Sequence, residues 1–332
     1  DTINGWFKRR NNWETSASIT QELIDRVSVD VAYYRRSQGN FTTNDNLDVT
    51  PSDFDQYCVT APTDSRLPSD VSGKPVCGLF DITPAKFGVA TNNLVTYVSN
   101  FGGKQTEVFN GIDVAVNARV RRDFFVTGGF ATGNTTFNMC DAYVDNPKTA
   151  FGIVSTAAGT LPPTPGNGTT FQYCNYDTGW LTQAKMTGTY TLPWQKISVG
   201  GVMQNLPGQQ ILAYWNIVQA DATASLGRAL SGGANTSRTI PLIKPGTMYT
   251  PRRTQIDLRV AKTFEMKGSR RLQVMADVFN AFNSNAAVGA TSNAGEPPAA
   301  LNITYSPTTT TWLRPLNILQ ARYVKLGVQF NF

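Results

Sequence analysis

The last thirteen residues of the chain, Gln320 to Phe332, alternate between apolar and polar side chains. Successive side chains of a β-strand point to opposite faces of its sheet, so a strand formed by this segment has one apolar and one polar face. The apolar row ends on an aromatic side chain and consists of Val324, Leu326, Val328, Phe330 and Phe332. Strands that cross a membrane as part of a barrel have this pattern, with the apolar row toward lipid and the polar row toward the interior.

Eight further segments show the same alternation, so the sequence predicts about nine membrane strands. The clearest of them is Gln105 to Arg121, where apolar side chains from Val108 to Val120 alternate with charged and amide side chains. The predicted strands cover residues 13–23, 26–38, 105–121, 124–136, 179–191, 195–205, 251–265, 270–283 and 320–332.

The connections between these strands are alternately short and long. The long ones span residues 39–104, 137–178, 206–249 and 284–319. Outer-membrane barrels have short turns on the periplasmic side and long loops outside the cell, whereas a soluble β-sandwich has water at both ends and no reason for this alternation. We therefore expect an all-β, antiparallel transmembrane β-barrel in the bacterial outer membrane, with the four loops extracellular. A short extra strand is expected at Ile211 to Val218, within the third loop.

The composition is compatible with a barrel and excludes several kinds of site. Only 16% of the residues are charged, compared with about a quarter in ordinary globular domains, and no apolar run is long enough for a transmembrane helix. The chain has no histidine, which removes Ser-His-Asp and Cys-His catalysis and histidine-ligated metals. The net charge of +6 includes no basic block, so we expect no nucleic-acid partner. We predict no enzyme activity, no catalytic residue, no cofactor and no metal.

The four cysteines lie in the first two predicted loops. They allow three pairings, and we favour Cys58–Cys77 and Cys140–Cys174 because each bridge closes a single loop. Disulfides indicate an oxidising compartment, such as the periplasm or the cell surface. Zinc is the alternative, but the chain lacks a C-x-x-C pair.

Nine is an odd number of strands, whereas a single-chain bacterial barrel normally has an even number and both termini in the periplasm. If the last strand ends in the periplasm, the first, near Trp13, begins outside the cell. Unpaired strand edges at Trp13 and Gln320 would cost on the order of several kcal/mol for each unsatisfied backbone group in lipid. We therefore expect the chain to be the C-terminal part of a larger barrel.

Five motifs follow one another along nearly the whole chain. They are Asn12-Trp13-Glu14-Thr15-Ser16-Ala17-Ser18, Val29-Asp30-Val31-Ala32-Tyr33-Tyr34-Arg35, Gln255-Ile256-Asp257-Leu258-Arg259, Asp277-Val278-Phe279-Asn280-Ala281-Phe282-Asn283 and the segment from Gln320 to Phe332. In this order and spacing they resemble the C-terminal barrel portion of TonB-dependent outer-membrane transporters. They are most similar to the subgroup with a carboxypeptidase-regulatory-like N-terminal domain and a plug.

The resemblance implies a barrel of about 22 strands in a Gram-negative outer membrane, with gated, energy-dependent uptake of a bulky nutrient. The implied partners are outer-membrane lipid and lipopolysaccharide, the missing plug and remaining strands, and the TonB complex acting through the missing region. The C-terminal strand, with Tyr323, Phe330 and Phe332, also resembles the signal that the barrel-assembly machinery recognises.

The polar rows of the predicted strands supply the candidate functional residues. They would line a polar passage or contact a plug, although any wide barrel needs a polar interior. These residues are Asp113, Asn117, Arg119, Arg121, Asp257, Arg259, Gln273, Asp277 and Lys325.

Two further groups of residues are weighed in the same way. The first loop has carboxylates at 44–48 and 53–55 that would suit calcium, but their spacing fits no EF-hand, so we favour solvated loop acids. Trp13, Trp180, Trp194 and Trp312 lie near predicted strand ends, where the aromatic belts of membrane proteins occur.

Active transport is the leading hypothesis for function. A structural or adhesive barrel that displays disulfide-pinned loops is the first alternative, and it predicts no dependence on the proton gradient. A passive porin is the second.

Overall fold

The computed structural model describes residues 2–3, 8–89, 92–140, 146–150, 173–233, 236–268, 270–288, 304–308, 312–315 and 317–332. Parts of the predicted second and fourth loops, at 141–145, 151–172 and 289–303, lie outside the described residues. No helix among the described residues is both long enough and apolar enough to span a lipid bilayer.

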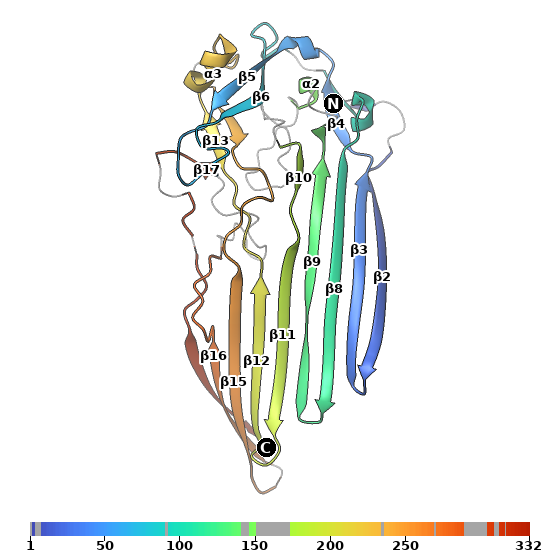
Figure 1. The fold of residues 1–332 in the computed structure, drawn as a ribbon, viewed down its shortest axis with the longest axis vertical. Helices are drawn as coiled ribbons and strands as arrows, with labels where there is room; N and C mark the ends of the chain where they lie inside the picture. The colour runs from blue at the N-terminus through green and yellow to red at the C-terminus, as the bar shows by residue number, and fades with distance from the viewer. Residues whose placement is uncertain are drawn as a thin grey trace.

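Nine long strands form one antiparallel sheet and run side by side along the long axis of the molecule (Figure 1). Their order is β18-β16-β15-β12-β11-β9-β8-β3-β2, so each strand pairs with the long strands before and after it in the chain. The nine are β2 (Asn11–Ile24), β3 (Val27–Gly39), β8 (Thr106–Arg121), β9 (Phe124–Asn138), β11 (Leu181–Leu192), β12 (Ile197–Leu206), β15 (Arg253–Glu265), β16 (Arg271–Phe279) and β18 (Tyr323–Asn331). They coincide closely with the nine predicted strands, which confirms the predicted all-β, antiparallel fold.

The sheet has two open edges. Within the described residues β2 pairs only with β3, and β18 pairs only with β16. A short strand, β10 (Asn175–Asp177), adds to the end of β9. A closed barrel has no edges, so this sheet is consistent with part of a β-barrel.

The connections alternate in position as well as in length. The four hairpin turns lie at one end of the sheet, together with the C-terminus, and the long connections gather at the other end (Figure 1). Positive φ angles at Arg26 (64°), Lys196 (50°) and Gly268 (77°) permit the tight reversals between strands.

The strand register divides the sheet into two chemically different faces. Directly paired residues of an antiparallel sheet lie on the same face, so Val114 shares a face with its partners Val31 and Phe130. We call this the apolar face and the opposite one the polar face. Large apolar-face side chains are exposed on every strand, including Trp13, Ile19, Val31, Ile112, Val116, Phe130, Met186, Val199, Leu258, Val260, Val274, Val324, Leu326 and Val328. Leu326 is 79% exposed and Val328 69%, although both lie mid-strand.

Parts of the first, third and fourth long connections pack around one hydrophobic core at the loop end of the sheet. We call this assembly, residues 54–82, 211–233, 236–243, 304–308 and 312–315, the cap. Its elements are β5 (Phe54–Thr60), β6 (Pro75–Ile82), β13 (Tyr214–Ile217), α3 (Gln219–Leu226), β14 (Arg238–Pro241) and β17 (Thr304–Tyr305). Its fully buried side chains include Leu79, Ile217, Ile240 and Leu242. The strand expected at Ile211 to Val218 is β13.

Smaller elements lie beside the cap at the loop end. β4 (Thr42–Asn46), β7 (Asn93–Tyr97) and β1 (Thr2–Ile3) form a separate three-stranded sheet. The short helices are η1 (Pro51–Asp53), η2 (Val98–Phe101) and α2 (Pro147–Ala150).

Trp312 is not a belt residue, contrary to the expectation from its place near a strand end. It is 1% exposed in the core of the cap, where its indole Nε1 donates a hydrogen bond to Leu212 O at 3.0 Å. Its ring also packs edge-on against Tyr305, with the ring centroids 5.3 Å apart. A buried indole needs a partner for its N–H, and the third connection supplies one. Trp13, Trp180 and Trp194, in contrast, are all exposed.

Glycines allow the closest strand contacts in the middle of the sheet. A Cβ on Gly129 would lie 2.1 Å from Val114 O and 2.9 Å from Ala115 Cα. Both obstacles are backbone atoms of the neighbouring β8, so a side chain could fit only if the two strands moved apart.

We expect Gly129→Ala to destabilise the sheet by about 1–3 kcal/mol, the usual cost of forcing extra atoms into a packed site. The change in stability is measured by urea unfolding of the detergent-solubilised protein, monitored through the circular dichroism of its β-strands. The control is Gly200→Ala on β12, where the nearest atom to the new Cβ is the Thr189 methyl group at 3.3 Å. Equal unfolding midpoints for the two variants would contradict the inferred backbone contact.

Candidate functional site on the polar face

The polar face gathers most of the polar residues that the sequence analysis singled out. Register and contacts place Asp113, Asn117, Arg119, Asp257, Arg259, Gln273, Asp277 and Lys325 on it. Arg121 departs from this row, because a bulge between Ala118 and Arg121 shifts the register and pairs Arg121 with Phe124 of the apolar face. A bulge moves the following side chain to the other face of a strand.

Three charged residues form a continuous row across the last strands. Arg259 pairs with Asp277, and Asp277 pairs with Lys325, so a carboxylate lies between two cations on β15, β16 and β18. The Arg259 guanidinium donates from Nε and Nη2 to the two Asp277 oxygens at 2.5 and 3.0 Å. Asp277 is only 5% exposed, whereas Arg259 and Lys325 are exposed. The three side chains of this row together carry one net positive charge, and Asp257 lies two positions from Arg259 on the same face.

A series of side-chain hydrogen bonds crosses the first four long strands on the polar face. Thr20 Oγ1 donates to Asp30 Oδ1 at 2.6 Å, and Thr127 Oγ1 donates to Asn117 Oδ1 at 2.6 Å. Asn117 Nδ2 links the two pairs through a longer contact of 3.5 Å to Asp30 Oδ2. Side chains of β2, β3, β8 and β9 are thus joined into one polar surface.

Asp113 differs from these residues because its neighbours are small. Its cross-strand partners are Ala32 and Ala131, and the described residues provide it with no hydrogen bond or ion pair. An exposed carboxylate with no partner keeps its full charge available to a solute or to another chain.

The remaining candidate residues are engaged within the sheet. Asp257 accepts hydrogen bonds from Gln255 Nε2 at 3.1 Å and from Asn280 N at 2.8 Å. Gln273 Nε2 makes a 3.5 Å contact with Thr263 Oγ1. The Arg119 guanidinium lies over the Phe125 ring, 5.8 Å from its centroid.

A cleft that the sequence did not predict lies where the polar face meets the long connections. Its volume is about 250 Å³, and it is lined by Arg36, Gln38, Glu107, Phe109 and Thr135. A second cleft of about 420 Å³ shares Gln38 and is lined further by Tyr97 and Lys104. Arg36 is paired with Glu14 at 2.9 Å. The only sequence signal for this cleft was an aromatic residue, Phe109, within the polar row of a predicted strand.

Two glycines hold Phe109 in place at the cleft. A Cβ on Gly111 or Gly133 would lie within 2.9 Å of the Phe109 ring, so the ring lies directly on the backbone of β8 and β9. Phe109 is nevertheless 37% exposed. An exposed aromatic face surrounded by charged and amide groups can stack on a sugar ring or an aromatic ligand while the polar groups bind its edges.

The C-terminal residues lie at the edge of the sheet. Tyr323 stacks on Phe279 with ring centroids 4.6 Å apart, and it lies on the polar face. Phe330 and Phe332 stack at 6.1 Å, and both belong to the apolar row.

The motif from Asp277 to Asn283 ends β16 at the loop end. Asn280, 3% exposed, donates from Nδ2 to Ser284 O and Gln320 O at 2.8 and 2.7 Å. Asn283 Oδ1 accepts a hydrogen bond from Arg322 N. Both asparagines have positive φ angles, which asparagine tolerates better than most residues. The motif therefore fixes where the final strand begins.

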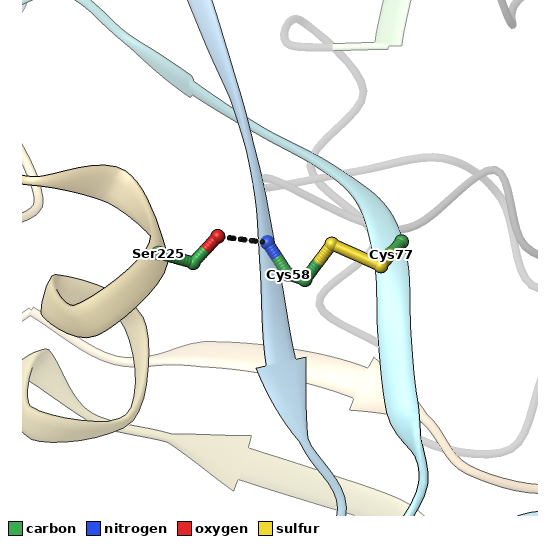
Figure 2. The surroundings of a disulfide bond; sticks show 3 residues. All are labelled: Cys58, Cys77 and Ser225. Carbon is green, nitrogen blue, oxygen red and sulfur yellow. Dashed lines mark hydrogen bonds between the residues drawn. A yellow bond between two sulfur atoms is a disulfide. The ribbon is translucent and has the colours of Figure 1, made fainter.

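Both predicted disulfides are present. Cys58–Cys77 joins β5 to β6, and Cys140–Cys174 closes the second connection. Figure 2 shows the backbone N–H of Cys58 donating to Ser225 Oγ of α3 at 2.9 Å. The first bridge therefore lies where the first and third connections meet.

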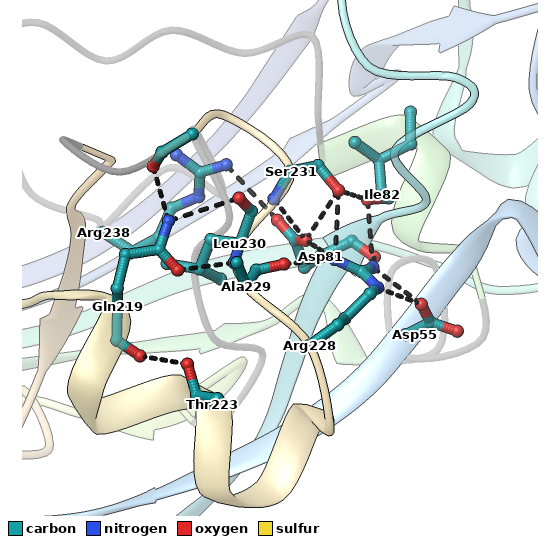
Figure 3. Close-up of polar contacts among 11 residues, drawn as sticks. Asp55, Asp81, Ile82, Gln219, Thr223, Arg228, Ala229, Leu230, Ser231 and Arg238 are labelled. Atoms are coloured by element: carbon teal, nitrogen blue, oxygen red, sulfur yellow. Dashed lines mark hydrogen bonds and ion pairs between the residues drawn. The ribbon is translucent and has the colours of Figure 1, made fainter.

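A buried cluster of ion pairs joins two connections within the cap (Figure 3). Asp81, with no exposed surface, accepts from Arg228 Nη1 at 2.6 Å and from Ser231 N at 2.9 Å. Arg228 Nη2 also donates to Asp55 Oδ2 at 2.6 Å, and Arg238 lies 3.5 Å from Asp81. A buried carboxylate needs such partners, because an unpaired one is strongly destabilising. Since the cations come from the third connection and the acids from the first, the cluster fixes these two connections together.

The loop acids considered for calcium have protein partners. Asp48 Oδ2 accepts from Asn92 N at 2.7 Å, and Asp53 accepts from the backbone N–H of Thr50 at 2.7 Å. These bonds to Thr50 hold the pKa of Asp53 below its usual value. Asp45 lies 3.0 Å from Lys148 Nζ, and Asp55 is paired with Arg228.

Comparisons with known proteins do not assign the chain to a family. No family model and no curated protein matches the chain. Three chains of solved structures match, among them the crystal structure of the outer membrane transporter YddB from Escherichia coli. The alignment has 10% identity and a TM-score of 0.40, and it covers 97% of this chain and 32% of that one. The chain thus spans about a third of that transporter's length. The fold assignment rests on the strand pairing described above.

The cap contains an acid whose ionisation should control its stability. Asp64 accepts hydrogen bonds from Arg66 Nη2 at 2.6 Å and from Tyr305 Oη at 2.8 Å, so it joins the first and fourth connections. The hydrogen bonds from Arg66 hold the pKa of Asp64 well below its ordinary value. Burial, together with the bond to Asp64, raises the pKa of Tyr305 to about 12.

We expect Asp64→Asn to lower the stability of the cap at pH 7 by about 1–3 kcal/mol, the usual range for hydrogen bonds to a charged group. Because the folded pKa of Asp64 is depressed, its contribution is complete above its unfolded pKa of about 4 and is lost as the pH falls through the folded pKa. The difference between wild type and variant should therefore narrow below about pH 4. Urea titrations followed by the fluorescence of the six tryptophans, of which Trp215 and Trp312 are buried in the cap, measure this. Asp70→Asn, at an exposed acid of the same connection, is the control, and a constant difference at all pH values would refute the linkage.

Proposed function

We propose that this chain forms part of the wall of an outer-membrane transporter, with its apolar face toward lipid and its polar face toward the interior of the barrel. The observation that carries the proposal is the exposure of large apolar side chains along the apolar face of all nine long strands. A face of this kind is unfavourable in water and favourable in hydrocarbon. The nine-residue β18 agrees with the nine to eleven or so residues that a tilted strand needs to cross a bilayer.

The open edges support closure by further strands. In hydrocarbon the unpaired backbone groups of β2 and β18 would have no water to bind, so each edge needs another strand. A larger barrel that includes this chain would provide them, and a plug would then face the polar row. Both partners remain proposals.

The polar face and the clefts at its loop end support passage of a solute. The paired charges on β15 and β16 and the unpaired Asp113 provide a hydrated surface along the proposed interior. The two clefts that share Gln38, one of them lined by Phe109, lie where a solute would enter from the cap side. We propose gated, energy-dependent uptake of a bulky solute by the complete barrel, with the TonB complex as the energy-coupling partner and the cap outside the cell.

A structural or adhesive barrel is the second candidate, and a specific feature favours it. The cap has its own hydrophobic core, a disulfide and a buried ion cluster, so it is a rigid unit of the kind that a surface protein presents to a partner. A passive porin is the third.

Uptake experiments with the full-length protein in its native membrane distinguish these functions. Cells with and without the gene are supplied with candidate solutes, with and without an uncoupler that collapses the proton gradient. Gated transport predicts uptake that requires both the gene and the gradient. Uptake that requires the gene but survives the uncoupler would favour a porin, and unchanged uptake would favour adhesion.

The assignment of the two faces predicts how a charged substitution on each face changes the stability of the protein in a membrane. Met186 lies on the apolar face in the middle of β11, and the adjacent Thr187 lies on the polar face. We expect Met186→Lys to destabilise the membrane-inserted protein by about 2–4 kcal/mol, as for a lysine facing lipid at the bilayer midplane. Thr187→Lys should have a much smaller effect, because its ammonium group would face the polar side. Unfolding titrations in lipid vesicles provide the measurement, and equal effects of the two lysines would refute the assignment of the faces.

A further inference from the structure

Arginines continue the apolar face at its loop end. Arg35 follows Val31 and Tyr33 in the apolar row of β3 and pairs with Asn110 of β8. Arg252 lies two positions before Thr254, an apolar-face position of β15 that pairs with Asn205. Arg322 lies two positions before Val324 of β18. All three arginines are exposed.

Uncharged oxygen atoms hold these arginines in position. Arg35 Nη1 donates to Asn110 Oδ1 at 2.9 Å, and Tyr33 Oη donates to the same oxygen. Arg252 donates from Nε to Asn205 Oδ1 at 2.9 Å. Arg322 Nη1 donates to Ala281 O at 3.2 Å. These bonds orient each guanidinium group without neutralising its charge.

Arginines on the polar face have a different environment. Arg36 is the neighbour of Arg35 on the same strand but faces the other way, and it forms an ion pair with Glu14 at 2.9 Å. Arg259 is paired with Asp277. Among the described residues Arg35, Arg252 and Arg322 have no such ion pair. The charges of these two polar-face arginines are therefore compensated by acids of the sheet, whereas those of Arg35, Arg252 and Arg322 are not.

The surroundings of these arginines are those of a membrane interface. Trp13 pairs with Ser37 on the apolar face, one step beyond Arg35, and is 74% exposed. Trp180, 52% exposed, lies between the strands that carry Arg35 and Arg252. Tryptophan is enriched where hydrocarbon meets the headgroups of a bilayer. Asp177 is an acid at this level, but its Oδ1 already accepts a hydrogen bond from Gly179 N at 2.7 Å.

We propose that Arg35, Arg252 and Arg322 bind the phosphate groups of anionic lipids in the leaflet on the long-loop side. This inference rests on the proposed membrane function, since it requires the apolar face to lie in lipid. Arginine is suited to the role because its planar guanidinium keeps its charge and can donate two parallel hydrogen bonds to a phosphate. A guanidinium already bonded to Asn110 or Asn205 still has free N–H groups for a lipid headgroup.

The test is a lipid titration of the purified full-length protein in neutral detergent. Native mass spectrometry counts the lipid molecules bound to the protein. Three lipids are compared: bis-phosphorylated lipid A, the same lipid without its phosphates, and zwitterionic phosphatidylcholine. Inorganic phosphate is tested as a fourth ligand. We expect preferential binding of the phosphorylated lipid, weakened by salt. Each Arg→Gln substitution should reduce the affinity by roughly fivefold, on the basis of the usual contribution of a basic residue near an anionic membrane surface.

The matched control is Arg253→Gln, because Arg253 lies next to Arg252 but on the polar face. It should bind the phosphorylated lipid as wild type does, whereas R35Q/R252Q/R322Q should lose the preference. Equal binding by the triple variant and wild type would overturn the inference, as would saturation by inorganic phosphate alone. Circular dichroism confirms that each variant is folded. If the wild-type protein binds phosphatidylcholine and the dephosphorylated lipid equally well and shows no phosphate preference, only the arginine proposal fails. If it binds no lipid at all, the membrane function itself fails.

Discussion

The register of antiparallel pairing is the constraint on which the rest of this structure depends. Side chains alternate with a period of two, so moving one strand by a single residue would exchange its apolar and polar rows. In nine adjacent strands the register gathers most of the large apolar side chains on one face and most of the charged side chains on the other, with exceptions such as Arg35. Where the register shifts, as at the bulge before Arg121, a charged side chain moves to the apolar face close to a turn. There it lies at the end of the sheet, where in the proposed membrane orientation a charge would cost less than in the middle of the bilayer.

The sequence predicted the sheet well because each long strand carries its own evidence. The alternation between Gln105 and Arg121, for example, requires no knowledge of the neighbouring strands, and the short turn at 122–123 defines the hairpin. The disulfide pairing was also predictable from residues near one another in the sequence, since Cys58 and Cys77 lie on the two strands of one hairpin. It also placed nearly all the candidate polar residues on one face, although their role in lining a passage stays a prediction.

The cap could not be predicted in this way, because its contacts join residues far apart in the sequence. Asp81 and Arg228 are separated by 147 positions, and neither lies in a recognisable pattern. Trp312 could not be placed from the sequence for the same reason. Its position near a predicted strand end suggested the aromatic belt of a membrane protein. Its burial depends on Leu212, Tyr305 and a core assembled from three connections. The cleft at Phe109 was missed for a related reason: its shape depends on glycines of two strands that only the fold brings together.

The two ends of the sheet make different demands on the chain. At the turn end each connection needs only a few residues, and positive φ angles at Arg26 and Lys196 allow the reversals. At the loop end the connections are long enough to bury their own apolar side chains, and parts of three of them form the core of the cap. In the proposed membrane orientation, the cap would lie in water and the apolar face of the sheet would lie in lipid. The proposed orientation puts Trp13 and Arg35 at the headgroup level between them, where aromatic and cationic side chains are better accommodated than in hydrocarbon.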